Sequence, residues 1–188
     1  MQLNKAIQDR LSVRKFLDKK PDWRIIIECI NASRYAPMAG GNFSLKVVMV
    51  DDPEKIQQIA RAAQQDFISK THYLVVFCSD KGRTTNAYGK RGEIYARQQA
   101  GAAIQNFWLK IVEADLGACW VGHFHEGQVK RVLKIPEEVD VEAIFPVGKK
   151  AIAHGEKSKP SRKIELDRFL YFNEYKNKRM KAPKNIKH

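Results

Sequence analysis

Cysteine is scarce in this chain, and long apolar runs are missing. The 188 residues include only three cysteines, Cys29, Cys78 and Cys119, which lie far apart in apolar surroundings. An odd number of scattered cysteines predicts reduced core thiols, with no disulfide framework and no cysteine-bound metal. No run approaches the roughly eighteen apolar residues of a membrane span, so we expect no transmembrane segment.

Motifs of several common enzyme classes are also missing. Neither a GxGxxG nor a GxxxxGKS/T pattern follows a predicted strand, which argues against a dinucleotide-binding fold or a P-loop. His123 and His125 are two residues apart and His154 is remote, a pattern that favours exposed or ligand-facing histidines over a metal site. No acidic residue has an apolar setting that would raise its pKa, so the sequence does not support a paired-carboxylate hydrolase.

The chain length fits one domain, because a chain of this size buries enough surface to fold without disulfides or a structural metal. Met1–Lys5 lack the charged start and apolar middle of a secretory signal, so we expect a cytoplasmic protein. No internal repeat or interdomain linker is visible in the sequence.

Positive charge exceeds negative charge. Lys and Arg number 34 against 21 Asp and Glu, a net charge of +13. This excess indicates an anionic partner such as a phosphate-bearing cofactor, a nucleic acid or a membrane surface. Residues 156–188 hold eleven basic and four acidic residues, a net +7 of that +13. We interpret them as a Lys-rich tail and expect no nucleic-acid partner, since no nucleic-acid motif accompanies the charge.

Apolar periodicity predicts helices and strands in mixed order. Strands are expected at 45–50, 73–78, 118–122 and 141–148, and the second, a continuous apolar run, should be buried on both faces. Helices are expected at 3–11, from an Asp22 cap to just before Pro37, from Pro53 to about Asp66, from 93 to a stop at Gly117, and at 126–133. We interpret the polar, glycine-dotted residues 80–92 as a loop that covers a site. This mixture predicts an α+β fold.

Arg10, Ser12 and Arg14 alternate after the first predicted helix. In an extended stretch their side chains point the same way. Two guanidiniums and a hydroxyl suit a phosphate or a polyol, but a solvated basic loop explains the spacing as well.

The Pro37–Gly41 turn is a second candidate. Gly40 and Gly41 tolerate positive φ and let backbone approach a flat ligand closely, although a plain tight turn accounts for them equally well.

Together these segments resemble the nitroreductase family of FMN-dependent oxidoreductases, over roughly residues 1–166. Residues 10–16, Arg-Leu-Ser-Val-Arg-Lys-Phe, are similar to the family's Arg-x-Ser-x-Arg/Lys-x-Phe signature, and residues 36–40, Ala-Pro-Met-Ala-Gly, to its Ala-Pro-Ser-Ala-Gly. Gln105-Asn106 and residues 116–124 resemble its Gln-Asn and Leu-Gly-x-x-x-Trp-x-Gly-x-Phe. Residues 146–148, Pro-Val-Gly, and the basic residues 159–163 follow in order.

The resemblance implies a central, mainly antiparallel sheet flanked by helices, in an intertwined homodimer with FMN at the subunit interface. Residues 1–168 would form the single FMN-binding domain, and residues 169–188 an aromatic, then basic tail that wraps the partner subunit or is partly disordered. Hydride would pass from NADH or NADPH through flavin N5 to a small electron-poor acceptor, a nitroaromatic, quinone or enone, by a ping-pong cycle.

The same resemblance implies the site residues. Arg14 would lie by the N1 and C2-oxygen edge of the flavin, and the backbone N–H of Gly122 or His123 would reach N5. Arg10, Ser12 and Arg162 would hold the phosphate and ribityl chain, with Lys163 as a helper. The turn would contact the ring from the other subunit through Pro37, Met38, Ala39, Gly40, Gly41 and Asn42. No metal is implied.

The chain departs from the family pattern at the turn. Met38 replaces the usual Ser, and residues 41–45 replace Asn-x-Gln-Pro-Trp, so the polar contact to the pyrimidine edge is missing or displaced to Asn42. Gln99 stands where many relatives have Asp. The departures leave open a specialised member such as a dehalogenase or a flavin-ring-cleaving enzyme. A non-catalytic flavin-binding protein is the remaining alternative.

Overall fold

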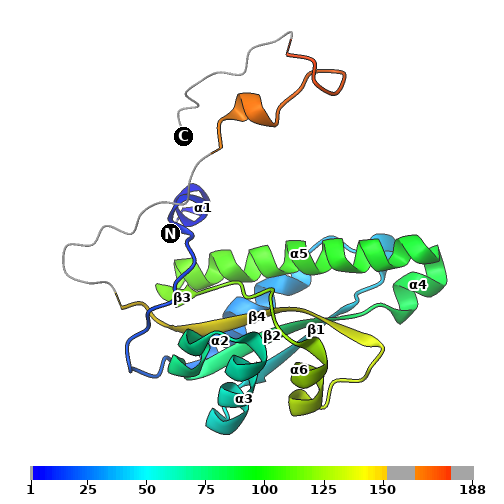
Figure 1. The fold of residues 1–188 in the computed structure, drawn as a ribbon. Coiled ribbons are helices and arrows are strands. Elements are labelled where there is room, and N and C mark those ends of the chain that lie inside the picture. The colour runs from blue at the N-terminus through cyan, green and yellow to red at the C-terminus, as the bar shows by residue number, and fades with distance from the viewer. Residues whose placement is uncertain (1, 152–163, 179–188) are drawn as a thin grey trace.

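A four-stranded antiparallel sheet forms the centre of the fold. The computed structural model describes residues 2–151 and 164–178. Strands β1 (Leu45–Val50), β2 (Tyr73–Asp80), β3 (Leu116–Ala118) and β4 (Val139–Lys149) pair in the order β1-β2-β4-β3 (Figure 1). In the central register Val76 lies opposite Val48 on one side and Ile144 on the other. The predicted α+β class, and the burial of the second strand on both faces, are confirmed.

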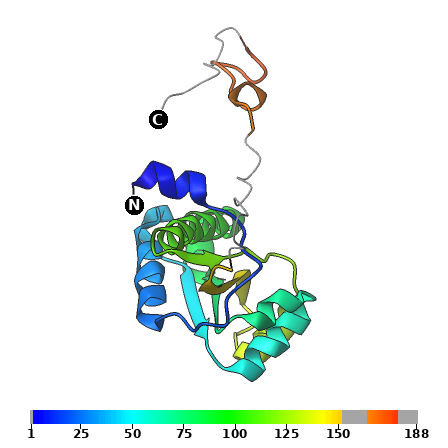
Figure 2. The ribbon, with the colours of Figure 1, turned by 90° about the vertical axis from the view of Figure 1, so that its left-hand side faces the viewer.

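Helices cover both faces of this sheet. Helices α1 (Leu3–Asp9), α2 (Trp23–Asn31) and α5 (Lys90–Glu113) share one apolar cluster with the side of β2 that carries Phe77. Helices α3 (Pro53–Ala63) and α6 (Glu126–Leu133) share the other with the side that carries Val76. Figure 2 shows the sheet between these two helical layers. Alternate side chains of β2 therefore pack into two separate hydrophobic cores, one on each face of the sheet.

Aromatic rings fill the core beneath α5. Phe77 of β2, Phe107 of α5 and Phe145 of β4 meet edge to face with ring centroids 5.0–5.7 Å apart. All three are fully buried. Aromatic pairs in this geometry stabilise by about 0.5–1.5 kcal/mol beyond the area they bury, so they fix α5 against the sheet.

Side-chain caps set two helix starts as the sequence predicts. The Asp22 carboxylate accepts a hydrogen bond from the Arg24 N–H at the start of α2. Asp52 accepts from Glu54 N–H ahead of α3, where Pro53 takes the first position. Each cap satisfies a backbone donor that the first helical turn leaves unpaired. A short 3₁₀ turn, Ala32–Tyr35, replaces the predicted last turn of α2. Helix α3 ends at Ala63, before the predicted end near Asp66, because Gln64 adopts a left-handed conformation, and a 3₁₀ turn at Asp66–Lys70 follows.

The prediction of a loop over residues 80–92 is wrong. Gly82–Tyr88 form helix α4, and α5 already begins at Lys90 after a positive-φ turn at Gly89. The segment lacks apolar periodicity because α4 buries only Thr84. It packs instead by backbone contact, with the Thr84 carbonyl against Gly92 of α5.

The predicted third strand is also displaced. Strand β3 covers Leu116–Ala118, and beyond it only Val121 bridges to Ile144. Helix α5 ends at Glu113, and Asp115, with φ 55°, turns the chain into the strand. Gly117 is therefore a strand residue and not the helix stop, and it leaves room for the Val13 side chain.

The cysteine prediction is confirmed, since Cys29, Cys78 and Cys119 are buried and free. Burial raises the pKa of Cys29 and of Cys78 to about 12. Among the described residues, no helix has both the length and the apolarity that a bilayer crossing requires.

Replacing Gly92 by Ala tests the junction of α4 and α5. The added Cβ would overlap the Thr84 carbonyl, so we expect Gly92→Ala to lower the free energy of unfolding by about 1–3 kcal/mol. Gly127 of α6 is exposed with open space around it, and Gly127→Ala should be neutral or slightly stabilising. Urea unfolding of both variants checks this, and equal stabilities would contradict the close packing.

Candidate functional site

The segment after α1 runs along one end of the sheet. Arg10 ends α1 in an extended conformation, and the Val13 N–H donates to the Ala118 carbonyl over 2.9 Å. Farther on, Phe16 bridges to Lys150 at the end of β4. Val13 is buried, and its neighbours Ser12 and Arg14 are exposed. The predicted extended conformation is present.

Ser12 and Arg14 both influence the thiol of Cys119. Burial raises the pKa of Cys119, while the charge of Arg14 and hydrogen bonds with Ser12 and Arg14 act in the opposite direction. The Arg14 guanidinium also lies 6.0 Å from the centre of the Phe67 ring. Ser12 and Arg14 are therefore side by side at Cys119, three residues before Gly122.

Arg10 takes a different partner. Its guanidinium carbon lies 4.4 Å from the centre of the Trp108 ring of α5. Trp108 in turn is 6.4 Å from Trp120, ring centre to ring centre. A cation over an indole face is stabilised by the ring quadrupole, so Arg10 is held against α5 while Ser12 and Arg14 face Cys119.

The Pro37–Gly41 turn has the backbone conformation that its glycines permit. Residues Ala39–Gly41 form a 3₁₀ turn in which Gly40 and Gly41 have φ of 56° and 72°. The Asn42 side-chain amide donates to the Ala39 carbonyl over 3.3 Å. The hydroxyl of Tyr88, from α4, occupies the space that a Cβ at Gly40 would need. Glycine is thus required at 40 by both conformation and space.

Gln99 of α5 ties this turn to the helix beneath it. Its Oε1 accepts from both the N–H and the hydroxyl of Ser44, each over 2.7 Å. Its Nε2 donates to the carbonyls of Pro37 and Asn42, each over 3.4 Å. Gln99 is 4% exposed, so these bonds form away from water. The sequence identifies Gln99 only as a departure from the family pattern, because nothing in its spacing predicts a contact with Ser44, 55 positions earlier.

Gly122 and His123 follow the sheet edge and are exposed. Gly122 lies against Trp120, whose Nε1 would be 3.6 Å from a Cβ placed there. The backbone N–H of the next histidine, His125, donates to the Ala62 carbonyl over 2.8 Å, and its ring Nε2 lies 3.3 Å from the Gln64 side-chain amide nitrogen. Within residues 2–151 and 164–178, no group of three metal-ligating side chains comes together.

Arg162, Lys163 and His154, named in the sequence analysis, lie outside the described residues.

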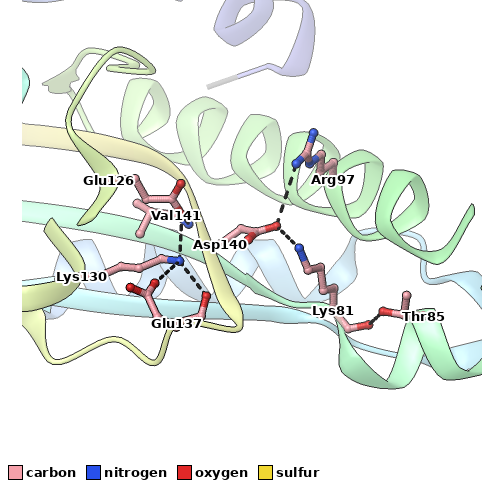
Figure 3. A network of polar contacts seen from close by, with 8 residues as sticks. All are labelled: Lys81, Thr85, Arg97, Glu126, Lys130, Glu137, Asp140 and Val141. Carbon is pink, nitrogen blue, oxygen red and sulfur yellow. Dashed lines mark hydrogen bonds and ion pairs between the residues drawn. The ribbon is translucent and has the colours of Figure 1, made fainter. Parts of the chain in front are cut away.

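Ion pairs hold the base of α4. Figure 3 shows the Asp140 carboxylate of β4 between Lys81, whose Nζ is 2.8 Å away, and Arg97 of α5, at 4.0 Å. The Asp140 and Lys81 side chains are about a quarter exposed, so solvent screens them only in part. A neighbouring cluster pairs the nearly buried Lys130 with Glu126 and Glu137. Sequence spacing gave no sign of the Lys81–Asp140–Arg97 network, whereas Glu126 and Lys130 have the i,i+4 spacing of a helical ion pair.

Comparison with known proteins gives consistent matches. The model of the Nitroreductase family matches residues 7–72 and 61–149. A Methanocaldococcus jannaschii protein named as a nitroreductase is 32% identical over 55% of this chain, which spans about half, 52%, of that relative's length. A Methanothermobacter thermautotrophicus protein, named as an NADH dehydrogenase/NAD(P)H nitroreductase, is 24% identical over 79% of this chain and 77% of its own.

A solved structure of the same fold is that of the NADPH:FMN oxidoreductase from Vibrio harveyi in complex with NAD⁺. It superposes with a TM-score of 0.81, covering 93% of this chain and 78% of the other, at 20% sequence identity. At this identity the likeness shows the fold alone, and it confirms the fold that the sequence resemblance implied.

Proposed function

The chain belongs to the nitroreductase family, and on that premise we propose that it is an oxidoreductase that holds FMN and takes hydride from NADH or NADPH. When bound, FMN would supply the hydride chemistry that links this donor to a small electron-poor acceptor such as a nitroaromatic, a quinone or an enone. Two substrates that use one open site in turn give a ping-pong cycle. The names of the Vibrio and Methanothermobacter proteins support the cofactor and the donor.

One observation carries this proposal: the Val13 N–H bonds to the Ala118 carbonyl, which brings the exposed residues Ser12 and Arg14 beside the strand that leads to Gly122. The Ser12 hydroxyl suits a phosphate or a polyol chain, the Arg14 guanidinium suits the negatively charged edge of a reduced ring, and exposed backbone N–H groups suit an acceptor atom on a flat ring. The Val13–Ala118 hydrogen bond joins these two groups of donors, although about 110 residues separate them in the sequence. The donors present therefore fit FMN.

We assign the roles as follows. Arg14 would stabilise negative charge on the reduced ring at its N1 and C2-oxygen edge, and the N–H of Gly122 or His123 would serve as the hydrogen-bond donor to N5. Arg10 and Ser12, with Arg162 and Lys163, bind the phosphate and ribityl chain. The Pro37–Asn42 turn of the other subunit contacts the ring, and no side-chain acid or base is needed.

A homodimer is part of this proposal. Exposed large apolar side chains gather on the elements of the α5 layer: Leu3 and Ile7 on α1, Trp23 and Ile27 on α2, Tyr35 after α2 and Ile94 on α5. Such a surface is costly to leave in water and suits a subunit interface. The described part of the tail, residues 164–178, stands apart from the sheet and helices in Figures 1 and 2, and we propose that it wraps the partner subunit. The buried free thiols fit a reducing compartment such as the cytoplasm.

The absorbance spectrum of the FMN-loaded protein tests the function. We expect a flavin spectrum between about 300 and 550 nm that bleaches when NADPH or NADH is added without oxygen, since hydride transfer reduces the ring. Bleaching by one donor identifies it. Bound flavin that resists both donors would favour a flavin-binding protein or a specialised flavin chemistry, and failure to bind FMN would contradict the proposal.

Arg14 and Arg162 should have separable effects. Removing the cation beside the reduced ring, in Arg14→Ala, should lower the flavin reduction potential and slow reduction by about tenfold or more, with a smaller loss of affinity. Arg162→Ala should mainly weaken FMN binding. Potentiometric titration and FMN binding measurements on both variants check this, and equal affinity losses without a change in potential would contradict the assignment.

The subunit interface can be tested by mass. We expect light scattering to report twice the mass of the 21.6 kDa chain, and Ile7→Glu to weaken this dimer because it buries a charge. A monomer that still binds FMN tightly would contradict an interface site.

A further inference from the structure

Gln99 makes four hydrogen bonds: two to the Pro37 and Asn42 carbonyls of the candidate turn and two to Ser44, which follows it. We infer that it is a positioning residue, which sets the Pro37–Asn42 turn in the geometry that receives the flavin ring. The inference rests on the proposed function for the identity of the ligand. The contacts themselves are independent of that function, since they connect a helix to a turn within one chain.

The two halves of the Gln99 amide match the groups they meet. Its oxygen faces two donors, both from Ser44, and its nitrogen faces two acceptors, the carbonyls of Pro37 and Asn42. A carboxylate at this position would have no hydrogen to donate to those carbonyls, and an aliphatic side chain would satisfy none of the four groups. An amide is thus the side chain that satisfies both sets at once.

The anchor also joins the turn to rigid elements. Ser44 precedes β1, and its carbonyl accepts the N–H of Asp80, at the end of β2, over 2.8 Å. Gln99 lies in the buried stretch of α5. The turn is therefore fixed to the sheet at Ser44 and to the helix at Gln99. Above it, the Tyr88 hydroxyl packs against Gly40.

This arrangement accounts for the departure at residues 41–45. The Ser44 hydroxyl is committed to Gln99, and one amide hydrogen of Asn42 is committed to the Ala39 carbonyl. A ligand can meet the backbone of the turn, the other amide hydrogen and the Oδ1 of Asn42, and the Met38 side chain, which is 44% exposed. The positions of these backbone groups depend on the φ and ψ angles of the turn. Ligand affinity through them therefore depends on how rigidly the turn is held in place.

Gln99→Glu is the sharpest test. It keeps the size and shape of the side chain, but it replaces the N–H donor that faces the Pro37 and Asn42 carbonyls with a carboxylate oxygen, which accepts. Burial and the two facing carbonyl oxygens should raise the pKa of the introduced carboxyl, while the two Ser44 donors oppose this rise because they favour the ionised form. Only the neutral carboxyl can donate a proton to a carbonyl. As pH rises through that pKa, the ionised form repels the carbonyls and the turn loosens. We expect the FMN affinity of Gln99→Glu, relative to that of the unmodified protein at the same pH, to fall by about tenfold or more as pH rises.

Gln98 provides the matched control, since it is the adjacent residue of α5 and is exposed. Gln98→Glu adds the same charge without touching the turn, so its FMN affinity should follow that of the unmodified protein. Ser44→Ala removes one of the four bonds, and its effect on affinity should be less than additive with Gln99→Leu. A Gln99→Glu affinity as independent of pH as that of Gln98→Glu would overturn the inference.

Hydrogen exchange separates the anchor from the flavin. In the FMN-free full chain, the Ser44 amide should exchange faster in Gln99→Leu than in Gln98→Leu, because it loses its acceptor. Equal exchange would overturn the anchor whatever the protein binds. Faster exchange in a protein that fails to bind FMN would support the anchor and refute the proposed function, so the two failures are distinguishable.

Discussion

Strand β2 is paired on both edges and covered on both faces, and the rest of the structure is arranged around that burial. Its residues from Tyr73 to Ser79 are almost inaccessible to water. Their backbone groups must therefore be satisfied by β1 and β4, and their side chains by helices above and below. The long helix α5 supplies one cover and helices α3 and α6 the other. Each candidate site segment is attached to this buried frame.

The candidate site is built where the frame ends. The Arg10–Phe16 segment joins the sheet through Val13 and Phe16, and the segment from Cys119 leaves it after β3. The turn is fixed to α5 by Gln99 and to the end of β2 through Ser44. Backbone and small residues thus present most of the ligand-facing groups, while the packed interior supplies their precision. The proposed reaction would rely on electrostatics and placement, since it would need no side-chain acid or base.

Local patterns in the sequence predicted the helices and strands whose buried side chains recur at a regular spacing. The apolar run at 73–78 predicts a strand buried on both faces, and the Asp22 and Pro53 signals predict helix starts, because burial and caps act over a few residues. The pattern failed at α4, which is held by a backbone contact at Gly92 and by the Lys81–Asp140 pair. Contacts between residues far apart in sequence leave no period, so the segment resembled a loop.

By itself the sequence determined the α+β class, the family, and the candidate residues that its ordered motifs mark. Tertiary structure alone decided which of them meet: Ser12 and Arg14 at Cys119, Arg10 at Trp108, and the turn at Gln99. The physical reason is the range of the forces concerned. Helix propensity, capping and periodicity depend on residues that are close together in the sequence. Hydrogen bonds and ring contacts across the fold join residues that are far apart in the sequence, and only the folded chain brings these together.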